Sequence, residues 1–207
     1  MFFKEAISAS LLGSLNELMA MDELKLLRLV GGTALALQMG HRESVDIELF
    51  GQHDLEDVDL LRNLSVFPVL QRLRNSHSIQ VFLIQDVKLD IVNYPYPWLD
   101  PPVIEQGIRM ASARDIAAMK ISAITNRGSR KDFVDLYFLM QEFSLEEILD
   151  FYMEKFRDAN RWLALRSLPY FEDAEMEPMP KMLHDIFWTD VKSTISRAVF
   201  DLAGFDE

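Results

Sequence analysis

The chain has 207 residues, no cysteine and a formal net charge of −12. This length allows one large domain or two small ones, and the lack of cysteine excludes disulfides and thiolate metal sites. The strong negative charge argues against a general nucleic-acid-binding protein. The apolar start precedes the first lysine, unlike a secretory signal peptide, and no apolar run is long enough to predict a membrane span, so we expect a cytoplasmic protein.

The first half of the chain predicts alternating helices and strands. Residues 3–20 place apolar side chains along one broad side, the pattern of an amphipathic helix. The apolar run 24–30 predicts a strand that ends at a glycine pair, and Thr33 can cap a short helix that ends at Gly40. The later segments are a strand at 44–50, a helix at 54–74, the paired strands IQVFLI and VKLDIV, and an irregular proline-rich stretch at 93–102.

The second half of the chain predicts helices. Ser112 with Asp115, and Ser144 with Glu147, have the spacing of helix capping boxes, and Gly128 interrupts the helical pattern between them. We therefore expect an α+β protein with two parts. The first part is a mixed α/β core, residues 1–108, and the second is an all-helical C-terminal half, residues 109–207.

Two glycines follow the first predicted strand. Gly31 and Gly32 lie between that strand and a helix start, where backbone N–H groups can face an anion and the absence of a side chain lets a phosphate approach. A glycine pair between a strand and a helix is also a common turn. The pattern is neither a Walker loop nor a dinucleotide fingerprint, because the required glycines and lysine are missing.

Acidic side chains alternate with apolar ones in SVDIELF, residues 44–50. Asp46 and Glu48 therefore share one face of the predicted strand, about 7 Å apart. Alternating charge is typical of an exposed strand face, but paired carboxylates can also bind Mg²⁺, which prefers oxygen ligands. Asp90 lies in the apolar strand VKLDIV, and it would join the pair if the two strands are neighbours. Three carboxylates facing phosphate donors would form a metal-dependent phosphoryl-transfer site.

Basic residues gather between positions 109 and 131, where the net charge is +5. A local basic patch on an acidic protein suits a polyphosphate or an RNA end, although basic residues can also simply decorate a helix end. Lys120 lies between isoleucines on one helix stripe, so it either extends its ammonium to water or points into a cleft toward an anion. Asp132 could pair with Lys120 or with a nearby arginine. An acidic, proline-bearing segment at 172–180 predicts a solvated loop.

Several motifs together resemble those of the AbiEii/AbiGii-type nucleotidyltransferase toxins, which are relatives of the polymerase-β-like nucleotidyltransferases. The resemblance is carried, in order, by GGTALALQMGHRESVDIELF, KLDIV and AMKISAITNRGSRKDFVDLY. It covers residues 31–50 and 110–138 well and the last seventy residues hardly at all. It implies a polymerase-β-like nucleotidyltransferase core with a mixed sheet, followed by helices that complete the active-site cleft.

The resemblance also implies roles for individual residues. Asp46, Glu48 and Asp90 would be catalytic residues and ligands of Mg²⁺ or Mn²⁺, and Lys120 and Asp132 would complete the catalytic set. The expected contacts of the nucleotide and its phosphates are Gly31, Gly32, Thr33, Arg42, Ser44, Arg127 and Arg130.

The reaction implied by the resemblance transfers a nucleotidyl group from an NTP to an acceptor hydroxyl and releases pyrophosphate. The acceptor would be an RNA end, such as that of a tRNA, or a protein. The protein would be the toxin of a toxin–antitoxin or abortive-infection pair, with a cognate antitoxin protein as its partner and no membrane association.

Glu48 departs from the family pattern, which usually has aspartate at this position. Glutamate reaches about 1 Å farther, and a misplacement of that size can cost about a hundredfold in rate. Two alternatives therefore stay open. One is a weakly active or inactive nucleotide-binding or interaction module on the same fold, and the other is a nucleotidyltransferase of the antibiotic-modifying type with a small-molecule acceptor.

Overall fold

A computed structural model describes residues 2–53, 56–76 and 78–204 of the chain. The fold consists of two compact units. Unit 1 comprises Met1–Tyr96 and Pro101–Ala111, and unit 2 comprises Pro97–Asp100 and Ser112–Glu207. The domain boundary expected after residue 108 stays a prediction. Unit 1 extends to Ala111, and unit 2 also includes residues 97–100 of the proline-rich stretch.

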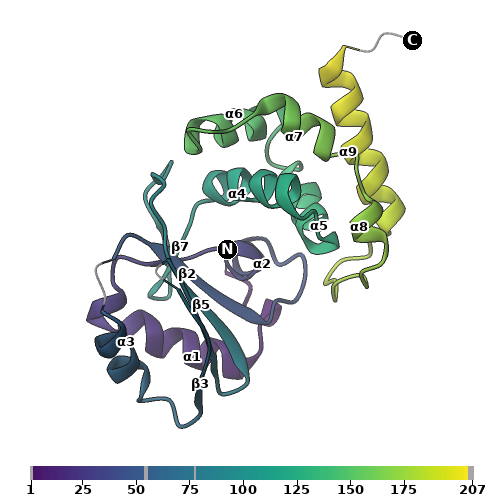
Figure 1. The fold of residues 1–207 in the computed structure, drawn as a ribbon. Coiled ribbons are helices and arrows are strands. Elements are labelled where there is room, and N and C mark those ends of the chain that lie inside the picture. The colour runs from purple at the N-terminus through teal and green to yellow at the C-terminus, as the bar shows by residue number, and fades with distance from the viewer. Residues whose placement is uncertain (1, 54–55, 77, 205–207) are drawn as a thin grey trace. The chain divides into compact units, whose positions relative to one another are not determined.

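Unit 1 is built on a mixed seven-stranded sheet (Figure 1). Its order is β3-β4-β5-β2-β1-β7-β6, with parallel pairing of β2 to β5 and of β1 to β7 and antiparallel pairing elsewhere. The strands are β1 (Arg28–Leu29), β2 (Asp46–Gly51), β3 (Leu70–Asn75), β4 (Ile79–Ile84), β5 (Val87–Asn93), β6 (Val103–Glu105) and β7 (Ile108–Met110). The helices of this unit are η1 (Lys4–Ala6), α1 (Ala9–Ala20), η2 (Asp22–Leu24), α2 (Gly31–Met39) and α3 (Asp57–Leu64).

The predicted strands at 44–50 and in the two later apolar runs are confirmed. In β2 the side chains of Ile47 and Leu49 are buried while those between them are partly exposed, as period-two alternation requires. Strands β4 and β5 form the predicted hairpin. Its turn residues, Gln85 and Asp86, both have positive φ, as the favoured two-residue hairpin turns require at one or both positions.

Several local predictions in unit 1 are wrong or incomplete. The strand expected at 24–30 is only the two-residue β1, and the helix expected at 3–20 is divided into η1 and α1. The helix expected at 54–74 ends at Leu64, and the chain then forms β3, because pairing with β4 outweighs the local helical pattern. The N-cap of α2 is Val30, since the helix begins at the glycine pair and Thr33 lies inside its first turn. The short hairpin of β6 and β7 was not predicted.

Unit 2 contains helices (Figure 1). They are α4 (Ala113–Asn126), α5 (Arg130–Leu139), α6 (Leu145–Lys155), α7 (Arg161–Ser167), α8 (Glu172–Glu175) and α9 (Trp188–Ala203). Ser112 and Ser144 accept hydrogen bonds from backbone N–H groups as predicted N-caps, and Gly128, with φ of 52°, breaks the chain between α4 and α5. The acidic segment predicted as a loop begins with the single turn of α8. In the part of the chain that the structure describes, no helix is long and apolar enough to cross a membrane.

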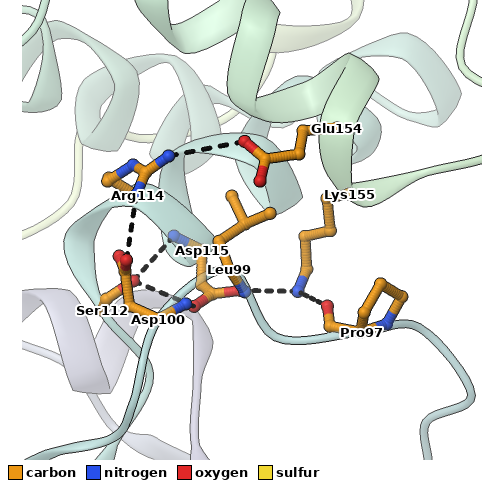
Figure 2. Close-up of polar contacts among 8 residues, drawn as sticks. All are labelled: Pro97, Leu99, Asp100, Ser112, Arg114, Asp115, Glu154 and Lys155. Atoms are coloured by element: carbon orange, nitrogen blue, oxygen red, sulfur yellow. Dashed lines mark hydrogen bonds and ion pairs between the residues drawn. The ribbon is translucent and has the colours of Figure 1, made fainter.

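A buried ion pair fixes residues 97–100 within unit 2 (Figure 2). Lys155 Nζ lies 2.6 Å from Asp115 Oδ1, and both side chains are fully buried. Lys155 Nζ also donates to the carbonyl of Pro97 at 2.8 Å, while Asp115 accepts hydrogen bonds from the backbone N–H groups of Leu99 and Asp100. We call these five residues the Asp115 cluster. The proline-rich stretch is irregular, as predicted, and this cluster explains why its second half belongs to unit 2.

Candidate active site

Three predicted acidic residues share one face of the sheet in unit 1. Strands β2 and β5 are parallel neighbours, and their register places Glu48 directly beside Asp90. Asp46 lies two residues before Glu48, so its side chain is on the same face. This face is partly exposed, whereas the opposite face carries buried apolar side chains. The two strands are therefore neighbours, which was the condition for Asp90 to join Asp46 and Glu48, and the three carboxylates occupy adjoining positions.

A lysine that sequence reasoning did not select stands among these acids. Lys88 is the register partner of Asp46 and forms an ion pair with Asp90, with 2.6 Å between Nζ and Oδ2. Asp90 Oδ1 is buried and has no hydrogen-bond partner among the described residues. The alternation of Lys88 and Asp90 in VKLDIV could have indicated that both side chains lie on one face.

The glycine pair lies directly against two predicted site residues, Glu48 and Arg42. Gly31 has φ of 66°, and a Cβ atom there would lie 1.7 Å from Glu48 Oε2. A Cβ atom on Gly32 would lie 2.0 Å from Arg42 Nη2. The backbone N–H of Val30 donates to the carbonyl of Glu48, at 2.9 Å, which ties the turn to β2. Gly31 is therefore needed both for its left-handed backbone and for the space that the Glu48 carboxylate occupies.

The other predicted nucleotide contacts of unit 1 are buried. The Thr33 hydroxyl lies 2.8 Å from that of Ser44 and also donates to the Asp46 carbonyl, so it joins α2 to the start of β2. Arg42 is 4% exposed, and its Nη1 donates to the Glu43 carbonyl at 3.0 Å. These contacts give Thr33, Ser44 and Arg42 a supporting position behind the glycine turn. Their contact with a nucleotide stays a prediction.

The acidic face has the right chemistry for a divalent metal ion. Carboxylate oxygens are the ligands that Mg²⁺ and Mn²⁺ prefer, and the unpaired Asp90 Oδ1 is a buried acceptor that a cation would satisfy. Within the described residues, no three His, Cys, Asp or Glu side chains are arranged so that they could hold a metal ion. Asp90 is instead paired with Lys88, and the Glu48 carboxylate lies against Gly31.

Lys120 of unit 2 lies in a buried ion-pair group that includes Asp132. Its Nζ is 2.8 Å from Asp132 Oδ1 and 2.6 Å from Asp135 Oδ2, and all three side chains are almost fully buried. The Ser129 hydroxyl donates to Asp132 Oδ2 at 2.6 Å. The expected pairing of Lys120 with Asp132 is therefore observed, and Lys120 does not extend to water. Asp135, which lies on the same helix face as Asp132, is an additional partner of Lys120 that was not among the expected site residues.

The electrostatics of this group favour an ionised Asp132. Burial acts to raise the pKa of the Asp132 carboxyl, but the charge of Lys120 and the hydrogen bonds from Lys120 and Ser129 together outweigh it, so the pKa lies below its ordinary value. A buried carboxylate that is ionised and hydrogen-bonded in this way keeps a fixed orientation.

The two predicted arginines of unit 2 differ in their surroundings. Arg127 has a side chain that is 65% exposed, with its Nε 3.6 Å from Asp132 Oδ2. Arg130 is engaged inside the unit: Nε donates to the Ala174 carbonyl and Nη2 to the Glu175 carbonyl, both at 2.9 Å, and the guanidinium stacks on Trp188. Arg127 is free to meet a ligand, whereas Arg130 holds α8 and α9 near the start of α5. Their predicted triphosphate contacts stay predictions.

Comparison with known proteins identifies the family. The family model described as nucleotidyl transferase AbiEii toxin, type IV toxin–antitoxin system, matches residues 15–205. An uncharacterized protein of Aquifex aeolicus strain VF5 is 35% identical over 179 residues, which cover 83% of this chain and 85% of that protein.

Solved structures show the same fold at low sequence identity. A putative nucleotidyltransferase of H. pylori aligns with a TM-score of 0.58 and 16% identity, covering 95% of each chain. MenT4, a nucleotidyltransferase toxin of Mycobacterium tuberculosis H37Rv, aligns with a TM-score of 0.60 and 12% identity, covering 94% of this chain and 83% of its own. ANT(2″)-Ia has a TM-score of 0.56 and 15% identity, covering 71% of this chain and 97% of its own.

These likenesses confirm the expected polymerase-β-like core with its mixed sheet. The match of the family model over nearly the whole chain confirms the resemblance drawn from the glycine turn, the acidic strand and the lysine–aspartate helices. The chain belongs to the AbiEii nucleotidyltransferase toxin family.

Proposed function

We propose that this protein transfers a nucleotidyl group from an NTP to a hydroxyl of an RNA end or a protein, with release of pyrophosphate. The observation that carries the proposal is the face of unit 1 where Asp46, Glu48 and Asp90 adjoin the Gly31-Gly32 turn. Membership of the AbiEii family supports a role as the toxin of a toxin–antitoxin pair, with an antitoxin as its partner.

The residues of unit 1 have separate tasks in this proposal. The N-terminus of α2 at Gly31 and Gly32 attracts a phosphate, which would have to displace the Glu48 carboxylate from the space beside Gly31. Asp46, Glu48 and Asp90 would hold Mg²⁺ or Mn²⁺. A bound divalent ion of this kind neutralises charge that develops on the phosphates during nucleotidyl transfer.

Lys88 supplies positive charge to the acidic face through its ion pair with Asp90. Its ammonium neutralises Asp90 and is itself partly exposed, so it can move toward solvent or toward a bound phosphate. Glu48 differs from a shorter aspartate because its extra methylene carries the carboxylate over Gly31.

A second candidate is a nucleotide-binding module with little turnover. The Lys88–Asp90 ion pair and the position of the Glu48 carboxylate on Gly31 favour it, because both hold the acids away from a common metal. A transferase with a small-molecule acceptor is the other alternative, since the structure of the fold relative ANT(2″)-Ia was solved with adenylyl-2″-tobramycin.

Incubation of the pure protein with Mg²⁺, each α-³²P-labelled NTP in turn, and bacterial RNA or protein fractions tests the proposal. We expect label in one of these fractions and its loss in Asp46→Asn. The matched control is Asp59→Asn, because Asp59 is a half-exposed residue of α3 in the same unit and outside the acidic face. NTP binding without label in any fraction would favour the binding module, and label only on an added aminoglycoside would favour the small-molecule transferase.

A further inference from the structure

The Asp90 carboxylate on the acidic face is only half paired. Its Oδ2 atom lies 2.6 Å from Lys88 Nζ, whereas its Oδ1 atom is buried and has no hydrogen-bond partner among the described residues. The side chain as a whole is 17% exposed, so water reaches little of it. Because proteins pair almost all of their buried polar atoms, one ammonium leaves Asp90 incompletely satisfied, and a cation that reached Oδ1 as well would lower the cost of burying it.

The neighbours of Lys88 leave this face negatively charged. Strand register places Lys88 beside Asp46 of β2 on one side and beside Leu83 of β4 on the other. No ion pair reaches the Asp46 carboxylate from the part of the chain that the structure describes. The three carboxylates of the face carry three formal negative charges against the single positive charge of Lys88, so the face attracts a cation of higher charge than an ammonium.

Lys88 differs from the two buried lysines that pair with aspartates elsewhere in the chain. The side chains of Lys120 and Lys155 are 7% and 0% exposed, and each makes a second polar contact besides its aspartate. The side chain of Lys88 is 43% exposed, and its ion pair with Asp90 is its one side-chain contact within the described ranges. Because its flexible stem can carry the ammonium into water, this ion pair can open without loss of core packing.

We propose that Lys88 is a displaceable counter-ion of Asp90, which competes with a divalent cation for the acidic face and so sets the affinity of the protein for that cation. The inference rests on the proposed function, because the cation would be the one assigned there to Asp46, Glu48 and Asp90. Lys88 is a positioning residue in this scheme and not a metal ligand. The ion pair that favours the binding module as a permanent contact is then a contact that the protein opens when it takes up a divalent ion.

Titration of the pure protein with Mn²⁺ alone, without NTP or acceptor, tests this inference by electron paramagnetic resonance of the free ion. Lys88→Met should tighten Mn²⁺ binding about tenfold, because a charge-assisted contact no longer has to be broken. Lys88→Arg keeps a cation beside Asp90 and should bind Mn²⁺ no more tightly than wild type.

The matched control is Arg74→Met. Arg74 is an exposed cation on the same face of the sheet, because it pairs with Val81 of β4 and Val81 pairs with Asp90. It makes no ion pair with any residue that the structure describes. Its replacement removes the same charge from the face without touching Asp90, so the Mn²⁺ affinity should stay within about twofold of wild type.

A second background separates the ion pair from the general charge of the face. In Asp90→Asn, the further change Lys88→Met should alter Mn²⁺ affinity by less than about threefold, since no ion pair is left to break. Lys88→Gln should reproduce the effect of Lys88→Met, and thermal unfolding checks that each variant is folded.

The outcomes separate this inference from the transfer reaction, because Mn²⁺ binding is measured where no transfer can occur. Equal tightening by Lys88→Met and Arg74→Met, or equal effects of Lys88→Met with and without Asp90→Asn, would overturn the inference. Unchanged affinity in folded Lys88→Met and Lys88→Gln, or no Mn²⁺ binding by any variant, would also overturn it. Tighter Mn²⁺ binding by Lys88→Met together with failure of label transfer would instead count against the proposed function alone.

Discussion

At the scale of single residues, Gly31 is a position where the structure argues strongly against any other amino acid. Gly31 combines a left-handed backbone with contact to the Glu48 carboxylate, so any side chain there meets two separate obstacles. The glycine pair indicated a turn that could face a phosphate. It gave no sign that the Glu48 carboxylate would lie against Gly31. That contact depends on the pairing of β1 with β2, which local sequence does not encode.

We predict that Gly31→Ala lowers both stability and function. A Cβ atom at 1.7 Å from Glu48 Oε2 must displace the carboxylate, and the positive φ adds about 1 kcal/mol of strain for a residue other than glycine. Gly107→Ala separates the two effects, because Gly107 also has positive φ, of 83°, but has open space around it. Urea unfolding should show a larger loss of unfolding free energy for Gly31→Ala than for Gly107→Ala. Equal losses would show that displacement of the Glu48 carboxylate has no energetic cost.

Lys120 is predicted to stabilise unit 2 in a pH-dependent way. Lys120→Met leaves Asp132 and Asp135 buried without their cation, which should cost about 3–5 kcal/mol of unfolding free energy at pH 7. The pKa of Asp132 is lower in the folded protein than in the unfolded chain, so its pairing contributes stability above the unfolded pKa, near 3.9. This contribution is lost as the pH falls through the folded pKa.

Urea unfolding of wild type and Lys120→Met from pH 7 to pH 3 checks this prediction. The difference between the two proteins should shrink toward acid, because a protonated Asp132 needs no cation. Lys131→Met is the control, since Lys131 is an exposed lysine at the start of α5 and its replacement should have little effect on stability at any pH. A difference between wild type and Lys120→Met that is the same at both pH limits would contradict the account.

At the scale of elements, the Asp115 cluster joins two helices to an irregular segment. Asp115 lies in the first turn of α4, Lys155 is the last residue of α6, and both hold residues 97–100 (Figure 2). The sequence predicted Ser112 and Asp115 as a capping box, and Ser112 is indeed the cap. It did not predict Lys155 as the partner of Asp115, because the two are 40 residues apart and neither stands in a recognisable motif.

We expect Lys155→Met to destabilise the protein by about 3–5 kcal/mol, because it leaves the Asp115 carboxylate buried without a counter-charge. Arg114→Gln provides the contrast within the same region. Arg114 forms more exposed ion pairs with Asp100 and Glu154, so its replacement should cost less than about 1 kcal/mol. Chemical denaturation of both variants measures the difference, and a loss for Arg114→Gln as large as that for Lys155→Met would refute the assignment.

Element prediction succeeded where the signal was local and failed where pairing decided the outcome. The β4–β5 hairpin and the capped starts of α4 and α6 follow from alternation, turn residues and capping spacing. The residues of strand β3 were expected to continue a helix, since their sequence has no clear period-two pattern. In the structure most of the side chains of β3 are exposed. An edge strand of this kind gains its structure from its neighbour, so only the fold reveals it.

At the scale of the whole molecule, the order of motifs along the chain was more informative than any single motif. The glycine pair, the alternating acids and the lysine–aspartate helices each had an ordinary structural explanation when taken alone. Their shared order indicated the family, and the family model confirms it over residues 15–205. The place of Lys88 between Asp46 and Asp90 arises from the register of β2 and β5, which the order of motifs does not encode.

Binding of Mn²⁺ in the presence of an NTP tests the central claim most directly, because it requires no knowledge of the acceptor. Electron paramagnetic resonance would compare wild type with Asp46→Asn, Asp90→Asn and the control Asp59→Asn. The account predicts Mn²⁺ binding by wild type and the control, and binding weakened at least about tenfold in the other two variants, since each loses a carboxylate ligand. Equal Mn²⁺ binding by wild type, Asp46→Asn and Asp90→Asn would contradict the assignment of the acidic face of β2 and β5 as the metal and nucleotide site.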